Sequence, residues 1–187
     1  TFYQAVGNTL IASVTNFYVW FALTFWLYLE TRSVLATSII GGSFMVVSSS
    51  VGFFLGSIVD HHRKKRAMLL SSLLTLFFFS AALAFYLSVP TERFTSVANP
   101  EVWGIAALIL FAVCAGNIRM IAMPTLVTLL IPEGERDKAN GLSGMVMGIS
   151  SSGAGIASGA VLAYFGMGWV LGSAVVLTVV AILHLLW

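Results

Sequence analysis

The sequence has little charge and little cysteine. Only 9% of its 187 residues are Asp, Glu, Lys or Arg, whereas 59% are hydrophobic. A soluble domain carries roughly 25% charged residues because its surface faces water, so this composition excludes a soluble domain. The net charge of +2 excludes a nucleic-acid partner, because the few cations are clustered rather than spread over a basic face. The one cysteine, Cys114, excludes an internal disulfide and a cysteine metal site, and we expect neither metal nor cofactor.

Long apolar runs dominate the rest of the chain. A bilayer core of about 30 Å needs roughly 20 helical residues, and these runs are too long for barrel strands. They predict an all-α membrane protein, embedded in a lipid bilayer, with short connections between its helices. Because the chain starts at Thr1 and stops at Trp187 inside an apolar stretch, we expect a fragment. The six expected transmembrane helices cover residues 3–29, 37–59, 67–89, 102–131, 142–165 and 169–187.

The cations are divided unequally between the connections. If the N-terminus is cytoplasmic, the connections over 60–66 and 132–141 also face the cytoplasm, and they hold six Lys or Arg residues. The other side holds only Arg32 and Arg93. Cytoplasmic connections carry an excess of Lys and Arg, so this bias predicts a cytoplasmic N-terminus.

Residues 56–69 read GSIVDHHRKKRAML and gather charge at the end of the second expected helix. Gly52, Gly56 and Asp60 are spaced one helical turn apart, and such small residues let two helix backbones approach closely in lipid. Asp60 is able to pair with a cation or a helix N-terminus, and such a pair latches one bundle against another in one conformation. The alternative is a simple topology anchor. The cations beside Asp60 are Arg63, Lys64, Lys65 and Arg66.

The same stretch carries a resemblance. Gly56, Ile58, Asp60, Lys64 and Lys65 fall on the positions of G-x-L-x-D-x-x-G-R-[KR], the loop 2–3 signature of the major facilitator superfamily. The chain therefore resembles that superfamily, and VDHHRKKRAM is closer to the variant of its macrolide-efflux-like branch. Two positions depart from the signature: Arg63 replaces the second glycine, and Lys64 replaces the arginine that makes bidentate pairs.

The resemblance implies a secondary transporter that works by alternating access and is not an enzyme. It also implies two six-helix halves, each made of two inverted three-helix repeats, with a small-molecule substrate held between the halves. The chain would be the N-terminal half, and its partner would be the missing C-terminal six-helix half. The branch favours a multidrug or macrolide-like exporter in the bacterial inner membrane, which is the plasma membrane.

Arg119 is the single charge expected well inside a span, about a dozen residues from the cytoplasmic end of the fourth helix. An ionisable group at that depth costs several kcal/mol unless it faces a wet cavity or a partner. It is a candidate for the substrate or proton pathway, a role that the resemblance implies for an arginine of helix 4. Met123 replaces the glycine of the usual R-x-x-x-G pattern. The alternative is a structural arginine that snorkels or pairs with Asn117.

Helix 1 supplies two further pathway candidates, Asn8 and Asn16, which share a face because they are eight residues apart. Their amides either hydrogen-bond a substrate or tie the helix to a neighbour. The aromatic residues at 17–28 form an interfacial belt or line a hydrophobic site together with Met120 and Met123.

Helix 5 is rich in glycine. Gly144 with Gly148, and Gly155 with Gly159, have the GxxxG spacing of close helix packing. Antiporters of the superfamily carry G-P-x-x-G-G in this helix. Gly155 and Gly159 match its glycines, whereas Ile156 and Ala160 depart from it.

No Asp or Glu lies deep in an expected span. If the protein is proton-driven, the titrating carboxylate is Glu30, Asp60 or a residue of the absent half. Two other functions stay open. GLSG at 141–144 fits the G-x-S-G pattern, so Ser143 with His184 is a possible dyad of an intramembrane serine protease. A chain that is natural at this length would instead be a non-transporting membrane scaffold subunit.

Overall fold

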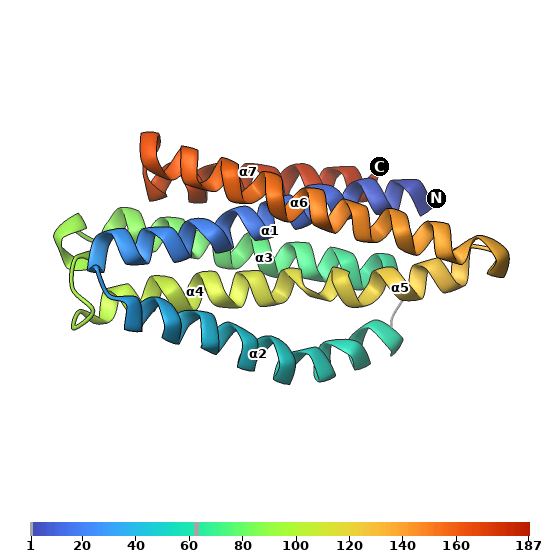
Figure 1. The fold of residues 1–187 in the computed structure, drawn as a ribbon, viewed down its shortest axis with the longest axis horizontal. Coiled ribbons are helices and arrows are strands. Elements are labelled where there is room, and N and C mark those ends of the chain that lie inside the picture. Colours follow the sequence, from blue (N-terminus) through green and yellow to red (C-terminus); the bar gives the residue numbers. More distant parts are fainter. Residues whose placement is uncertain (1, 62–63) are drawn as a thin grey trace.

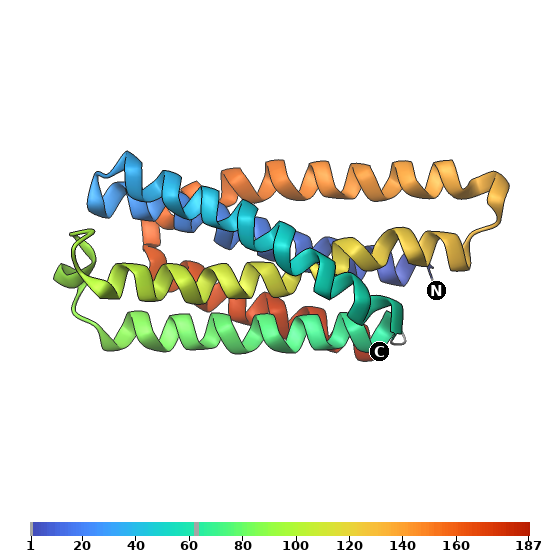
Figure 2. The same cartoon turned by 90° about the horizontal axis from the view of Figure 1, so that it is seen from below.

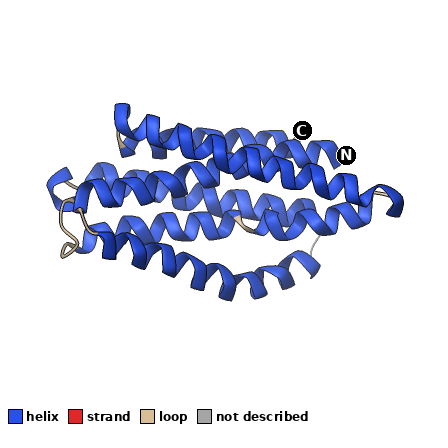
Figure 3. Ribbon diagram, in the orientation of Figure 1, coloured by secondary structure: helices blue, strands red, loops and turns tan. Residues whose placement is uncertain are grey.

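The computed structural model describes the backbone of residues 2–61 and 64–187, and all their side chains except those of 51–61, 64, 120 and 121. Every regular element in these ranges is helical, and no strand occurs in them (Figure 3). The elements are α1 (Phe2–Thr31), α2 (Val34–His61), α3 (Lys64–Ser88), η1 (Thr91–Phe94), α4 (Pro100–Gly116), α5 (Ile118–Leu130), η2 (Glu133–Glu135), α6 (Arg136–Phe165) and α7 (Met167–Leu186).

The helices run side by side as one elongated bundle (Figures 1 and 2). α1 contacts α6, α7, α4 and α2, while α3 contacts α4, α5 and α7. Both termini lie at one end, together with the end of α2, the start of α3 and the α5–α6 connection (Figure 1). We call this the terminus end. The α1–α2, α3–α4 and α6–α7 connections lie at the opposite end, and α5 continues the line of α4 (Figure 1).

Aromatic side chains close the opposite end of the bundle. Phe94 of η1 is 1% exposed, and its ring lies 5.4 Å from the rings of both Trp26 and Tyr86. Stacked and edge-to-face rings at such separations add to the stabilisation from apolar burial. Beside them, Arg93 Nε lies 3.4 Å from Glu101 Oε1. The connection between α3 and α4 is thereby fixed over the core.

Two helices differ from the expected bounds of the spans. The helix expected over 102–131 is two helices, because the chain leaves the α-helical pattern at Asn117, between α4 and α5. Gly116 and Asn117 both have weak helix propensity, which favours a break there. α6 begins at Arg136 rather than 142, so Lys138 and Asn140 belong to the helix and not to the connection. α6 ends where Gly166 adopts a φ of 82°, a left-handed backbone that favours glycine.

Four of the described helices are long and apolar enough to cross a membrane: Phe2–Thr31, Lys65–Ser88, Glu133–Phe165 and Met167–Leu186. Shorter apolar helices cover Val34–Ser50 and Pro100–Gly116. The expectation of an all-helical protein is confirmed for the described chain. Six spans remain a prediction.

The arrangement of the ends makes a topological prediction. In a variant with Cys114→Ala, single cysteines at Val97 and Gly134 lie at opposite ends of the bundle, so they face opposite sides of the membrane. A membrane-impermeant maleimide should label one in intact cells and the other only in inverted vesicles. The Cys114→Ala chain without a new cysteine is the control. Labelling of both positions from the same side would contradict the fold.

Candidate functional site

Arg119 lies in the first turn of α5 and is only 2% exposed. Its guanidinium donates hydrogen bonds to Asn8 Oδ1 of α1, to Ser72 Oγ of α3 and, at 3.4 Å, to the Met68 carbonyl oxygen. No carboxylate of the described residues pairs with it. A charge removed from water costs several kcal/mol unless hydrogen bonds satisfy it, so these neutral acceptors hold the guanidinium in place.

Asn8 extends this network to α7. It is fully buried, and its Nδ2 donates to the Ala181 carbonyl oxygen at 2.6 Å and lies 3.4 Å from His184 Nδ1. The two pathway candidates Asn8 and Arg119 are therefore brought together, and the network joins α1, α3, α5 and α7. Arg119 does not pair with Asn117, because its guanidinium donates to Asn8, Ser72 and Met68 instead. The Asn117 amide donates to Ser48 Oγ at 3.3 Å.

The break between α4 and α5 lies directly before Arg119. Three side chains from neighbouring helices donate to backbone carbonyl oxygens at the end of α4: Thr75 to Ala112 (3.2 Å), Asn16 to Val113 (3.0 Å) and Ser71 to Ala115 (2.7 Å). Backbone polar groups in a membrane need partners inside the protein, so these donors make an interrupted helix tolerable there.

Gly116 provides the space that Asn16 occupies. A Cβ built at Gly116 would overlap the Asn16 amide, so any side chain there would displace it from Val113. Sequence reasoning missed Gly116, Ser71, Ser72 and Thr75. The signal for the first was the Gly-Asn pair at 116–117 inside an apolar run, a pair of weak helix formers.

Three cavities surround these groups. The aromatic cavity, of about 150 Å³, lies between α1, α2 and the α4–α5 break; Asn16, Asn117, Phe17, Trp20, Phe21 and Phe44 line it. The methionine cavity, of about 210 Å³, lies between α1, α5 and α6, where Met123 and Met147 line it. The polar cavity, of about 200 Å³, lies at the terminus end, where its lining includes Asn8, Lys65 and His184.

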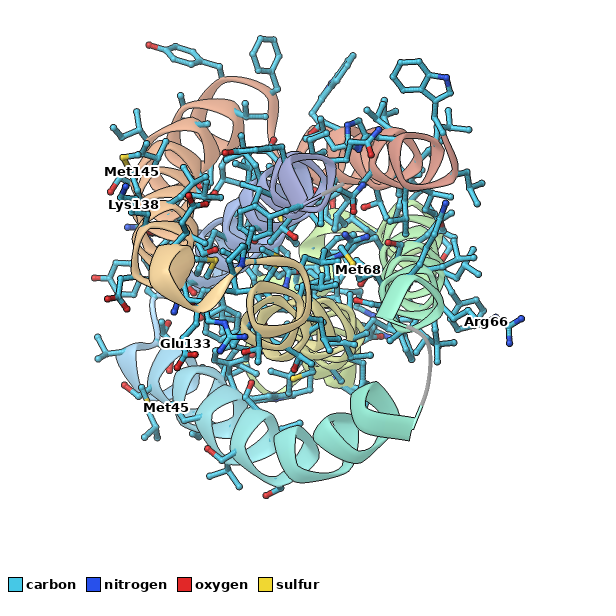
Figure 4. The ribbon with its side chains drawn as sticks, turned by 90° about the vertical axis from the view of Figure 1, so that its right-hand side faces the viewer. Met45, Arg66, Met68, Glu133, Lys138 and Met145 are labelled. Atoms are coloured by element: carbon cyan, nitrogen blue, oxygen red, sulfur yellow. The ribbon has the colours of Figure 1, made fainter. Side chains whose placement is uncertain are left out.

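The other expected site residues are scattered. Glu30 lies about 33 Å along α1 from Asn8, at the opposite end. Arg66 points away from the bundle at the terminus end, whereas Met68 points into it (Figure 4). The remaining residues of the latch lie outside the residues whose side chains the structure describes: Gly52, Gly56, Asp60, Arg63 and Lys64.

The glycines of α6 differ in what lies beside them. A Cβ built at Gly144 or Gly148 would meet no described atom within 4 Å. At Gly155 and Gly159 it would lie 3.6 Å and 3.9 Å from the rings of Phe21 and Phe25 of α1, which is ordinary contact. The role of the GxxxG pairs in close helix packing stays a prediction.

Ser143 and His184 do not form a dyad. Ser143 Oγ donates to the Ala139 carbonyl oxygen at 3.0 Å, and His184 contacts Asn8 instead. Ser143 lines the methionine cavity, whereas His184 lines the polar cavity. The geometry gives no support to the protease interpretation.

A comparison with known protein families identifies the family of this chain. A family model described as Major Facilitator Superfamily matches residues 6–187. The chain belongs to the major facilitator superfamily. Neither the comparison with curated proteins nor the comparison with solved structures finds a match. Together with its apolar helices, the family makes this superfamily member a multi-pass membrane transporter, embedded in lipid and built to bind a small-molecule substrate.

The contact at Gly116 makes a stability prediction for this superfamily member. Gly116→Ala should displace the Asn16 amide and break its bond to the Val113 carbonyl oxygen, which keeps only the Asn117 backbone N–H as a donor. The loss of one hydrogen bond should lower the free energy of unfolding by about 0.5–1.5 kcal/mol. Thermal unfolding of the purified protein in detergent measures the loss. Gly148→Ala is the matched control, because its Cβ meets nothing and alanine is the better helix former. Equal melting temperatures for the two variants would contradict the prediction.

Proposed function

We propose that this chain forms one half of a transporter that exports apolar small molecules by alternating access. The observation that carries the proposal is the buried Arg119 network beside an interrupted helix. Transporters build substrate and coupling sites from discontinuous helices near the middle of the membrane. A charge inside the membrane marks a functional pathway by default. The matched family is a transporter family, which agrees with both points.

Helix contacts support a half made of two inverted three-helix repeats. In the first repeat, α1, α2 and α3 correspond to α4 with α5, to α6 and to α7 of the second repeat. Helices that contact each other have counterparts that also contact each other. The contact of α1 with α6 corresponds to that of α2 with α4 and α5, and the contact of α1 with α7 to that of α3 with α4 and α5. In two of the contacts, α3 with α7 and α1 with α4, the two helices are each other's counterparts. A second six-helix half would complete the fold.

We assign the pathway to the groups around the break. Asn8 and Arg119 form the charged part, Asn16 lies at the aromatic cavity, and Met123 lines the methionine cavity. Aromatic and methionine side chains suit apolar substrates of varied shape. In a proton-driven exporter, Glu30 or Asp60 is the titrating carboxylate that this chain would contribute.

We infer the orientation in the membrane from the charges of the connections. The terminus end carries most of the cations, which favours a cytoplasmic N-terminus, in keeping with the proposed location in a bacterial inner membrane. The aromatic cluster around Phe94 then faces the outside.

Arg119 should matter for transport far more than a surface arginine. Arg119→Ala removes the donors to Asn8 and Ser72 and should lower transport at least about tenfold, a loss of about 1.4 kcal/mol. Uptake of a panel of apolar fluorescent molecules into inverted vesicles by the full-length protein measures it. Arg93→Ala, whose side chain is 59% exposed, is the control and should stay within about twofold. Equal activities would remove Arg119 from the pathway.

The loop between α2 and α3 is proposed as a latch at the cytoplasmic gate. Gly56 and the small residues before it allow close approach to the second half, and Asp60 pairs with a cation or a helix N-terminus in one conformation only. Lys65 and Arg66, both exposed at the terminus end, are available as cations on this side. The support comes from the loop 2–3 signature in the sequence.

Asp60→Asn tests the latch. The change removes the charge but keeps the size, so the protein should insert normally while transport falls at least about tenfold. Efflux and the amount of protein in the membrane are measured on the same vesicles. The matched control is Asp137→Asn, which removes an exposed carboxylate from the first turn of α6 on the same side of the membrane. Unchanged efflux in Asp60→Asn would eliminate the latch and leave the Arg119 pathway standing.

A further inference from the structure

We propose that the aromatic cavity binds an uncharged molecule with an aromatic ring and a hydrogen-bond donor, such as a hydroxyl or an N–H group. The inference rests on the proposed function, since it names the substrate class of that transporter. Three features of the cavity carry it: the rings of its wall, the two amide oxygens on that wall and the position of the nearest charge.

The walls of the cavity fit a flat ring. Its volume is about 150 Å³, and an apolar cavity of roughly 150 Å³ holds one benzene ring. The Trp20 and Phe44 rings lie 4.3 Å apart with an angle of 33° between their planes, and Phe17 and Phe21 are stacked at 6.3 Å. Aromatic pairs prefer offset or edge-to-face contact, so a ring that enters finds faces and edges to pack against.

The amides of the wall keep acceptors that the described residues leave unused. Asn16 Nδ2 donates to the Val113 carbonyl oxygen at 3.0 Å, and Asn117 Nδ2 donates to Ser48 Oγ at 3.3 Å. Each bond uses one of the two N–H groups of its amide, so each amide keeps its Oδ1 and one N–H. No donor of the described residues reaches either oxygen. A ligand that matches the cavity therefore supplies the donor.

The charges around the cavity disfavour ions of either sign. No lining residue is ionisable, so a cation would find no carboxylate among the described residues. It would also approach Arg119, because Asn16 separates the aromatic cavity from a small space that Arg119 lines. An anion would lose its hydration without meeting a cation in the cavity, because Arg119 is committed to Asn8, Ser72 and Met68. A neutral ligand avoids both penalties.

Four probes with one benzene ring test the proposal. They are phenol (neutral donor), anisole (no donor), benzoate (anion) and benzylammonium (cation). Each probe is dialysed to equilibrium between two compartments, one with nanodiscs that hold the full-length protein and one with empty nanodiscs, which corrects for partition into lipid. Liquid chromatography then measures the bound probe. We expect phenol to bind at least about tenfold tighter than each of the others. Equal or tighter binding of any other probe would overturn the proposal.

A charge change at the wall gives the second test. Asn117→Asp places a carboxylate in the cavity, and the Ser48 hydroxyl is able to donate to it, so the local contact is retained. The ratio of benzylammonium to phenol affinity should rise at least about tenfold. Asn99→Asp, directly before α4 and outside the three cavities, is the matched control and should leave the ratio unchanged. An unchanged ratio in Asn117→Asp, or an equal rise in both variants, would place the binding site elsewhere.

The experiments distinguish a failure of the cavity assignment from a failure of the proposed function. If the probes bind in the expected order but inverted vesicles accumulate no apolar molecule, the proposed function is wrong and the assignment of the cavity stands. If the vesicles transport apolar molecules but the probe order differs, the assignment is wrong and the transporter stands. Should Asn117→Asp not fold, the order of the four probes on the unaltered protein decides alone.

Discussion

The constraint on which this bundle depends is that polar groups inside an apolar environment need partners within the protein. The break between α4 and α5 presents carbonyl oxygens to its neighbours, and Arg119 directly after it presents a charge. α3 meets both demands with Ser71, Ser72 and Thr75, and α1 meets them with Asn8 and Asn16. Each bond forms only when the helix that supplies the donor has a particular rotation about its axis and a particular position along it. The polar groups therefore fix how α1 and α3 lie against α4 and α5. Apolar packing alone does not fix this, since lipid solvates apolar side chains as well as a neighbouring helix does.

Asn16 contributes both to the helix break and to the wall of the aromatic cavity. Its amide satisfies the Val113 carbonyl oxygen, lines the aromatic cavity and separates that cavity from the space beside Arg119. Gly116 makes this position possible, because a larger residue would exclude the amide. The same few residues therefore hold the helix break together and shape the wall that a ligand would meet. A discontinuous helix supplies such a wall at a depth where regular helices offer only side chains.

The sequence predicts the parts of this arrangement that depend on one segment alone. Apolar runs long enough to cross a membrane predict the helices, and a charge in the middle of such a run predicts that Arg119 is special. The pairing of Arg119 with Asn8 was not predictable, because it depends on how α1 and α5 are rotated against each other. The break at Asn117 was overlooked because the apolar run continues through it, and the early start of α6 was overlooked because polar residues at 136–141 resemble a loop. The latch at Asp60 stays a prediction.

Stability does not account for the buried arginine. Removing a charge from water costs several kcal/mol in a protein, even after relaxation. Hydrogen bonds from a charged group contribute about 1.5–3 kcal/mol each, so the bonds to Asn8 and Ser72 offset that cost without exceeding it by much. An apolar side chain of similar volume would serve packing as well or better, as replacements of buried ion pairs in other proteins illustrate. The charge is held by neutral oxygens and has no described carboxylate to cancel it, so its field extends into the neighbouring cavities. A charged group that adds little to stability and has no described counter-charge is better explained by a role in the transport pathway than by a role in holding the bundle together.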